Sequence, residues 1–385
     1  MTASELEQTY FVQDLPDLKV AANGQRTVFF RFYASDGPMI AIIYNNVLLN
    51  SFSETYYPDA DGYITIRNLA ETAKAYVSPQ ALSSINYVNP VQTWEHPYIK
   101  MTIEVRDPEA VNQLCNQFST FIYYANVRMG VVPTACRSFL SQYTTRRVLP
   151  WQPLLFSHVM FSDCSTKMVV AYTDTEGAQH RAEYTFDLTS VYNSYILNYA
   201  MTVATIATLL EIPAAGIYSV DVFLSENGTV KDVISFEIDR DFHRQAIGFC
   251  FTNCFGVPET EVLTGKDVRS DKMESEYSFV SNLYKKVHTE LVEEHKVCSG
   301  FIQETAYKSL LDMLRSDKVT LLQQDGSLGE EVVITETDFS EDRPHKAPNS
   351  VYLTYRVADR NQQKFTRRTT LPVRIFDQTF DESFE

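Results

Sequence analysis

The segment 216–238, GIYSVDVFLSENGTVKDVISFEI, is the feature of this sequence that most constrains the fold. Before residue 225 apolar side chains recur at every second position, which is the period of a half-buried strand. These positions are Tyr218, Val220, Val222 and Leu224. Asn227–Gly228 then supplies the pair that a type I′ turn prefers, because both central residues of that turn need a positive φ. The segment therefore predicts two antiparallel strands joined by a two-residue turn.

Strand-like sequence extends over most of the chain. The content of 23 Tyr and 24 Phe against 13 Gly favours strands and contact surfaces. Runs of β-branched and aromatic residues bounded by turn residues predict further strands. These runs fall within residues 27–33, 39–52, 63–66, 99–106, 118–124, 167–188, 246–257, 260–265, 319–323, 330–339 and 350–359.

Two segments have helical spacing instead. Residues 301–316 carry one apolar stripe, and Ser299 is available to cap the helix that it predicts. The stripe consists of Ile302, Ala306, Leu310 and Met313/Leu314. A shorter helix is expected after Asn68, its candidate N-cap. The predicted fold is mainly β with a few helices, in two or three β-sandwich or barrel-like modules.

A chain of 385 residues is too long for one ordinary core, so several domains are expected. We predict an N-terminal arm, an N-terminal β-rich domain, a central β-sandwich domain, a C-terminal α+β module and an acidic-aromatic tail. Their expected bounds are 1–25, 26–150, 151–275, 276–370 and 371–385.

The charge of the chain argues against nucleic acid as a partner. Its net charge is −16, whereas binding to phosphates needs clustered Lys and Arg. The compact basic clusters are Arg146–Arg147 and Arg367–Arg368 with Lys364 nearby, and both are expected to be solvated strand positions.

No membrane insertion is expected either. The acidic start, MTASELEQTYFVQDLPD, has no apolar run of the kind that a signal peptide needs, and polar residues interrupt the apolar stretch 195–224. The spacing of the six cysteines fits neither a disulfide scaffold nor a zinc site, so we expect buried free thiols. A single disulfide is the open alternative. The cysteines are Cys115, Cys136, Cys164, Cys250, Cys254 and Cys298.

No motif in the sequence predicts catalysis, a metal site or a cofactor. Glu237, Asp239 and Asp241 alternate as a solvated strand face would, and no glycosidase pair can be located among the carboxylates. Asp59-x-Asp61–Gly62 lacks the remaining ligands of a calcium loop and predicts a plain turn. The histidines are scattered, and no serine lies in a nucleophile elbow.

Two aromatic segments are candidate subunit contacts. In residues 251–266, FTNCFGVPETEVLTGK, a break at Phe255, Gly256, Val257 and Pro258 predicts either a projecting loop that contacts a neighbour or an ordinary turn within a domain. At the C-terminus Phe376, Phe380 and Phe384 recur every four residues among acidic residues. They predict either a segment packed on its own domain or a hook that docks in a neighbouring subunit.

Three stretches resemble structural proteins of phages and prophages of Bacteroidetes bacteria. They are SETYYPDADGYITIRNLAETAKAYV (53–77), CFTNCFGVPETEVLTGK (250–266) and ETDFSEDRPHKAPNSVYLTYRVADRNQ (336–362). The last contains a recurring Y-R-x-A-D-R ending at Tyr355, Arg356, Ala358, Asp359 and Arg360. The resemblance spans about residues 40–385, and its motifs are structural, with no catalytic role to carry over.

This resemblance implies a virion subunit of the tail or tail tip, similar to distal-tail or baseplate proteins. Such a subunit is made in the bacterial cytoplasm, uses β-sandwich domains, and contacts copies of itself and other tail proteins. Whether it contacts the host surface is left open. The alternatives are a carbohydrate- or surface-binding β-sandwich adhesin, which the many Tyr residues would suit, and a glycoside hydrolase.

Overall fold

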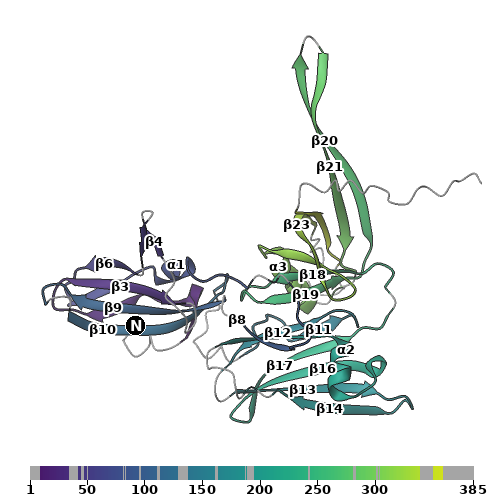
Figure 1. The fold of residues 1–385 in the computed structure, drawn as a ribbon, viewed down its shortest axis with the longest axis horizontal. Helices are drawn as coiled ribbons and strands as arrows, with labels where there is room; N and C mark the ends of the chain where they lie inside the picture. The colour runs from purple at the N-terminus through teal and green to yellow at the C-terminus, as the bar shows by residue number, and fades with distance from the viewer. Residues whose placement is uncertain are drawn as a thin grey trace, which may run out of the picture.

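The computed structural model confirms a mainly β fold with several separate sheets and few helices. It describes residues 9–33, 42–44, 47–49, 51–80, 82, 84–94, 97–110, 113–128, 138–160, 164–186, 188, 195–241, 243–280, 283–300, 302, 304–338 and 350–358. Figure 1 shows an N-terminal module on one side, a body of stacked sheets beside it, and a long hairpin that projects from that body.

The N-terminal module is a two-layered β-structure. Its five-stranded sheet has the order β1 (Tyr10–Phe11), β10 (Gln113–Tyr123), β9 (Tyr98–Asp107), β3 (Arg26–Tyr33), β6 (Phe52–Tyr56). The second layer holds the paired strands β2 (Leu18–Ala21) and β7 (Tyr63–Ile66), with the helices η2 (Val12–Asp14) and α1 (Leu69–Lys74). The strands β4 (Ile42–Tyr44) and β5 (Val47–Leu49) pair with each other.

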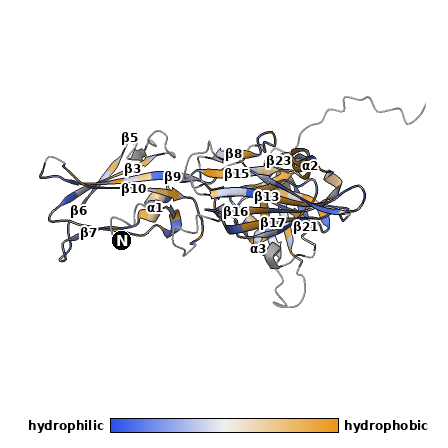
Figure 2. Cartoon of the chain, turned by 90° about the horizontal axis from the view of Figure 1, so that it is seen from below, coloured by the Kyte–Doolittle hydropathy of each residue, from blue (hydrophilic) through white to orange (hydrophobic). Residues whose placement is uncertain are grey.

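The two layers share one core because each strand buries every second side chain. In β3 the buried residues are Val28, Phe30 and Phe32, and Leu18 and Ile64 from the second layer belong to the same cluster. Figure 2 shows the resulting mixture of hydrophobic and hydrophilic residues along these strands. The Asp59–Gly62 segment is a turn, because Asp59 Oδ1 accepts hydrogen bonds from the N–H groups of Asp61 and Tyr63.

The N-terminal residues do not form the arm expected over 1–25, as far as the structure describes them. Residues 10–21 contain β1, η2 and β2, and β2 pairs with β7 along its whole length. Val12 and Leu18 are buried. Burying these apolar side chains holds the segment against the module. The polar residues around them in the sequence hide this apolar pattern.

The central module is a sandwich of two sheets. One has the order β11 (Thr145–Val148), β17 (Thr229–Ile238), β16 (Ile217–Glu226), β13 (Cys164–Thr173), β14 (Gln179–Thr185). The other consists of β12 (Leu154–Val159), β15 (Ile196–Met201) and β8 (Val91–Trp94). Phe156 and Tyr199 stack at 4.6 Å in the core that the sheets share. Two helices follow β15, α2 (Val203–Leu210) and η4 (Ala214–Gly216).

The predicted hairpin is confirmed as β16 and β17. Its strands pair up to Glu226↔Thr229, and the two turn residues have φ of 49° at Asn227 and 78° at Gly228, as a type I′ turn requires.

Replacing Gly228 with alanine is expected to lower the free energy of unfolding by about 1–2 kcal/mol, because a Cβ strains the left-handed backbone. No atom lies within 4 Å of the position that this Cβ would take, so the cost is conformational. Gly24 is the matched control, since its backbone is outside the left-handed region and its nearest atom lies 3.7 Å away. Chemical denaturation measures both, and equal effects of Gly228→Ala and Gly24→Ala would contradict the turn assignment.

The C-terminal module is built on a seven-stranded sheet. Its order is β19 (Pro258–Leu263), β18 (Ile247–Thr252), β22 (Val319–Leu322), β23 (Leu328–Asp338), β24 (Tyr352–Val357), β21 (Leu283–Cys298), β20 (Asp267–Val280). The helix predicted over 301–316 is confirmed as α3 (Glu304–Leu314), with Leu310 and Met313 buried in the core of this module. Ser299 does not cap it: the Ser299 hydroxyl donates to the Gly300 carbonyl and accepts from the Val351 N–H.

The sheets divide the chain differently from the expected bounds. The boundary at 275/276 falls inside β20, and β18 and β19 belong to the C-terminal sheet. β11 pairs with β17 and β8 with β15, so both strands join the central module although they precede residue 151. Pairing between strands far apart in sequence sets these modules, and composition does not reveal it.

The three modules meet in one apolar cluster. It combines side chains from the N-terminal strands β1, β9 and β10, the central strands β12 and β15, and the loop between β18 and β19. The buried members are Phe11, Tyr98, Tyr123, Ala125, Leu140, Val159, Ile196, Cys254, Phe255 and Val257. A shared core of this kind ties the modules into one unit.

Most of the described cysteines are buried, as expected, with one exception. Cys250, Cys254 and Cys298 are buried thiols and Cys164 is buried as well, whereas Cys115 is exposed, so the expectation of burial is wrong there. Cys136 lies outside the described residues.

None of the helices in the described part of the chain is long and apolar enough to cross a membrane.

Candidate functional site

The hairpin of β20 and β21 is the most unusual feature of the structure. Of the residues in β21, His295–Cys298 pair with β24, and among the described strands β20 pairs only with β21. From Ser270↔Glu294 to Val280↔Leu283 the hairpin is therefore a two-stranded ribbon of eleven residue pairs. At about 3.3 Å per residue it extends roughly 35 Å from the sheet. We call this part the arm, and Figure 1 shows it pointing away from the body.

The outer end of the arm, which we call the tip, exposes large apolar side chains. Tyr277, Phe279 and Tyr284 are 63%, 60% and 79% exposed. Tyr277 pairs with Lys286 and Phe279 with Tyr284, and directly paired or alternate residues lie on the same face of a ribbon. One face of the tip therefore presents three aromatic rings and an exposed Lys286, with Phe279 and Tyr284 in contact at 5.1 Å. Leu283, 63% exposed, lies on the opposite face.

Among the described side chains of the arm, the ion pairs between its strands are weak ones. The ion pairs Arg269–Glu293 (2.8 Å) and Lys272–Glu294 (2.5 Å) link its strands near the base, where surface pairs contribute about 0–1 kcal/mol each. An isolated two-stranded hairpin is at best marginally stable in water, and its open edges can pair with another chain. These properties are typical of a segment that is completed by a partner.

A buried ion pair lies in the body where β11 and β19 face each other. Arg146 Nη2 lies 2.6 Å from Glu259 Oε2, and the two side chains are only 8% and 2% exposed. Arg146 Nη2 also donates to Ser141 Oγ, and Asn253 Nδ2 donates to Glu259 Oε1 and to the Leu140 carbonyl. This polar network joins the central module to the C-terminal module.

Two more carboxyl groups border this network. Burial raises the pKa of Glu261 to about 7, although Ser309 Oγ donates a hydrogen bond to it. Burial also raises the pKa of Asp312 to about 6, and Asp312 Oδ2 accepts from the Cys254 N–H. Ser309 and Asp312 lie on α3, so these groups hold the helix against β19 and the loop that precedes it.

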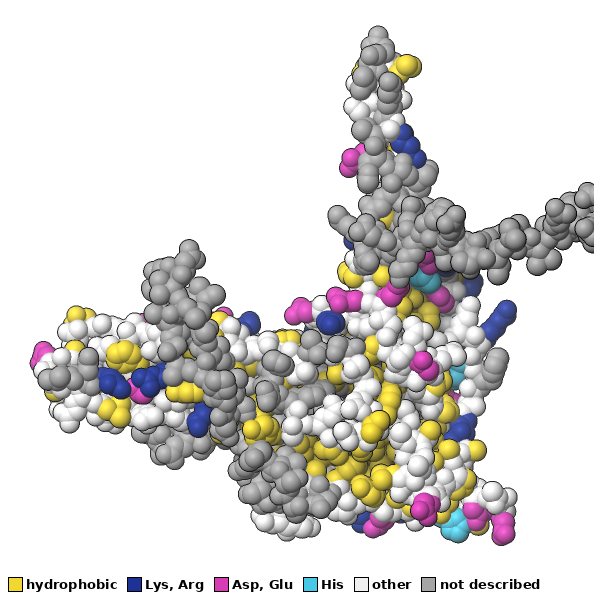
Figure 3. Space-filling view, in the orientation of Figure 1, with side chains coloured by type: hydrophobic (Ala, Val, Ile, Leu, Met, Phe, Trp, Pro, Cys, Tyr) yellow, Lys and Arg dark blue, Asp and Glu magenta, His cyan; other side chains and the backbone are white. Residues whose placement is uncertain are grey.

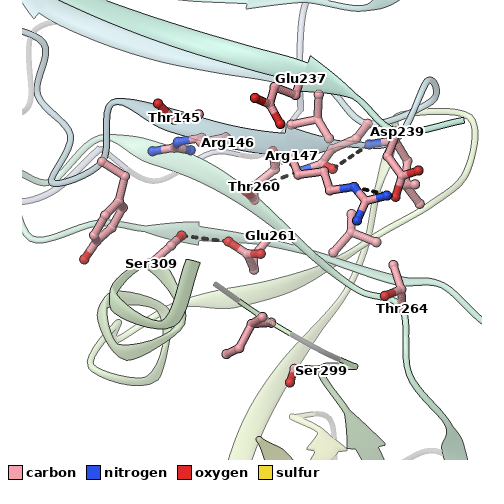
Figure 4. Close-up of a pocket in the computed structure, with 16 residues that line it drawn as sticks. Thr145, Arg146, Arg147, Glu237, Asp239, Thr260, Glu261, Thr264, Ser299 and Ser309 are labelled. Carbon is pink, nitrogen blue, oxygen red and sulfur yellow. Dashed lines mark hydrogen bonds and ion pairs between the residues drawn. The ribbon is translucent and has the colours of Figure 1, made fainter. Parts of the chain in front are cut away.

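A cavity beside this network does not have the size of a substrate site. Figure 4 shows it between β11, β19 and α3, with Arg146, Arg147, Glu261 and Ser309 around it. It encloses about 120 Å³, whereas small-molecule sites measure about 300–1,000 Å³. The described residues contain no group of three or more His, Cys, Asp or Glu side chains placed to hold a metal ion. We interpret the cavity as a gap at the contact between modules.

The raised pKa values predict that the chain is more stable in mild acid. Between about pH 4.5 and 7 the folded chain keeps a proton on Glu261 that the unfolded chain has released, so stability falls as the pH rises through this interval. Asp312 adds a fall of the same sign between about pH 4 and 6. Replacing Glu261 with glutamine is expected to raise stability at pH 8 by about 1–3 kcal/mol and to flatten the profile.

The measurement is thermal and chemical unfolding from pH 4.5 to 8. Glu237→Gln is the matched control, because Glu237 lines the same cavity but is exposed. Parallel pH profiles of stability for Glu261→Gln and the wild type would show that Glu261 does not cause the pH dependence.

The predicted contact loop at 255–258 lies inside the chain. Phe255, Gly256, Val257 and Pro258 are all buried. Gly256 has a φ of 75°, and a Cβ there would lie 2.6 Å from the Tyr124 ring. The Gln80 N–H donates to the Gly256 carbonyl, so the loop contacts the N-terminal module of its own chain. Phe376, Phe380 and Phe384 lie outside the described residues.

Other charged residues also lie differently from the expectation. Arg146 is buried, so the prediction of a solvated pair is wrong for it, whereas the Arg147 side chain is 61% exposed. Asp239 was expected on a solvated acidic face but is buried; its Oδ2 lies 3.0 Å from Arg147 Nε and 2.8 Å from His243 Nε2. The arm was not predicted at all. Its only signal was the run of exposed aromatics around Tyr277 and Tyr284 between charged residues.

No protein-family model matches this chain, and no curated protein sequence matches it.

Proposed function

We propose that this chain is a structural subunit of a larger protein assembly. The observation that carries the proposal is the arm: a ribbon roughly 35 Å long that ends in exposed aromatic side chains. Exposed aromatic groups on a projecting element make a protein that works alone prone to aggregation. Buried in an interface, such groups supply much of the binding energy of the complex. The three modules, joined by their shared apolar cluster, would then serve as the rigid base from which the arm reaches a neighbour.

In its specific form, the proposal is a tail or tail-tip subunit of a bacteriophage or prophage-derived virion. This part is supported by the resemblance of residues 53–77, 250–266 and 336–362 to such proteins. The partners would be copies of the chain and other tail proteins, without nucleic acid or membrane insertion. The chain would be made in the bacterial cytoplasm and end in the virion tail.

The proposal includes no catalytic activity. Support comes from the junction cavity, which is smaller than a substrate site and whose Arg146 and Arg147 already pair with Glu259 and Asp239. A glycoside hydrolase would need its two carboxyl groups to flank an open sugar site, and Glu261 instead accepts a hydrogen bond from Ser309 at a contact between β19 and α3.

One observation favours the adhesin as second candidate. Tyr277 and Tyr284 are exposed on one face of the tip, and aromatic faces of this kind can stack on sugar rings. Binding to a glycan array by a stable monomer would support that alternative over the assembly subunit.

The test of the virion proposal is to locate the chain in particles. Phage particles would be induced from a bacterium that carries the gene, purified, and analysed by mass spectrometry and by electron microscopy with gold-labelled antibodies against the chain. The proposal predicts label on the tail and a fixed ratio of this chain to the other tail proteins. Particles that lack the chain, or carry label on the head alone, would contradict it.

A further inference from the structure

A second surface on the body has properties that match the tip. An apolar groove of about 350 Å³ lies between the segment that leads into β8, the end of β15, and α2. Its lining includes Tyr87, Val88, Pro90, Met201, Thr208 and Leu209. Val88 is 88% exposed and Leu209 is 38% exposed, so the groove presents apolar side chains to solvent. Figure 3 shows hydrophobic side chains gathered on the lower part of the body, the end of the molecule where α2 lies.

Glu211 at the end of α2 is in an unfavourable place for an acidic residue. It has a φ of 56°, a left-handed conformation that strains any side chain with a Cβ. Its negative charge also lies at the C-terminus of a helix, where the helix dipole is negative. Among the described residues it forms no ion pair. A residue that is unfavourable on two counts and exposed suggests a role outside the folding of its own chain.

A second exposed carboxylate, Asp325, is adjacent in sequence to a residue that Tyr87 of the groove contacts. Tyr87, which lines the groove, donates a hydrogen bond of 2.7 Å to the Gly326 carbonyl, and the exposed Asp325 directly precedes Gly326. The lining of the groove is largely apolar, and the exposed Glu211 follows Leu209, one of its lining residues, by two positions. A ligand that fits the groove presents aromatic groups together with a cation.

The tip has this composition. One of its faces combines Tyr277, Phe279 and Tyr284 with Lys286, which pairs directly with Tyr277. Figure 1 shows the arm pointing away from the C-terminal sheet, and α2 in the central module beyond that sheet, so the tip lies far from the groove of its own chain. The occupant must come from a second copy.

We infer that the arm of one subunit docks its aromatic face in the α2 groove of the next, with Lys286 against Glu211 at the end of α2. This inference rests on the proposed function and specifies one contact within it. Because the two surfaces of the contact differ, each subunit keeps a free arm or a free groove after pairing. Such a heterologous contact generates a ring if the rotation closes, and a filament if it does not.

The first test is a cross-link between two kinds of chain. Val88→Cys is made in one preparation and Tyr284→Cys in another, both with Cys115→Ser to remove the thiol that is exposed in the described part of the chain. After mixing, a short bis-maleimide is expected to join them into a species of twice 44.0 kDa. Val230→Cys is the matched control for the groove, since Val230 is 52% exposed at the opposite end of the β16–β17 hairpin from α2. Equal cross-linking through positions 88 and 230 would overturn the inference.

The second test reverses the charges. Glu211→Lys and Lys286→Glu are each expected to weaken self-association about tenfold, because each places like charges opposite one another. The double variant restores complementary charges between neighbouring copies and is expected to recover most of the wild-type association. If the double variant associates no more tightly than the single variants, the pairing of Glu211 with Lys286 is overturned.

The outcomes separate this inference from the proposed function. Wild-type chains that associate without any effect of these variants would refute the docking contact and leave the assembly proposal standing. A groove cysteine that cross-links in particles to a different tail protein would also refute it. Chains absent from particles and monomeric in solution would refute both.

Discussion

Replacing Arg146 with methionine is expected to lower the free energy of unfolding by about 3–5 kcal/mol. The change leaves Glu259, whose side chain is 2% exposed, without its cation inside the junction between β11 and β19. Asn253 still donates one hydrogen bond to Glu259, but a buried carboxylate needs more than this to offset the loss of water. The chain has several modules, so unfolding would be followed with more than one probe.

Two further variants identify the cause. Arg147→Met is the matched control: Arg147 is the next residue, pairs with Asp239 and Asp241, and is 61% exposed, so its loss is expected to cost about 1 kcal/mol or less. Arg146→Met combined with Glu259→Met removes both charges and should recover much of the lost stability. If Arg146→Met costs no more than Arg147→Met, the buried pair does not stabilise the junction.

Removing the arm is expected to weaken self-association at least about 100-fold while the body stays folded. The variant replaces residues 270–294 with Asn-Gly, so that Arg269 and His295 are joined by a short turn. Association is lost because the aromatic anchors go, and two or more anchors of about 1–2 kcal/mol each amount to this factor. The body stays folded because no deleted residue belongs to a described core cluster: the tip residues are exposed, and Val292, although only 8% exposed, is a member of none of them.

A variant with the arm kept and its surface changed is the control for this deletion. Serine in place of the tip residues Tyr277, Phe279, Leu283 and Tyr284 leaves the ribbon in place and should produce nearly the same loss. Circular dichroism and thermal unfolding check the body, and sedimentation measures association. A trimmed chain that associates as tightly as the wild type would show that the arm is not the contact.

Local patterns in the sequence predicted the elements that local physics determines. The β16–β17 turn follows from Asn227–Gly228, and α3 follows from an apolar stripe that includes Leu310 and Met313, because turn geometry and helix periodicity depend on neighbours in the chain. The burial of Arg146 could not be predicted in this way. Its partner Glu259 lies more than a hundred residues later, and only the meeting of β11 with β19 makes the position buried.

The arm escaped prediction for a different reason. Strand prediction relies on alternation between a buried and a solvated face, whereas the apolar tip residues Phe279 and Leu283 are exposed on opposite faces of the ribbon. The loop at Phe255–Pro258 shows the converse problem. Its aromatic and apolar side chains predict a contact, but a neighbouring module of the same chain and a neighbouring subunit require the same chemistry.

The mass of the purified full chain as a function of concentration tests the central claim most directly. We predict that sedimentation and light scattering give masses that rise above 44.0 kDa as concentration increases, and that negative-stain images of the heaviest fraction show rings or filaments. A single species of 44.0 kDa at every concentration, both alone and mixed with the other tail proteins, would contradict the account.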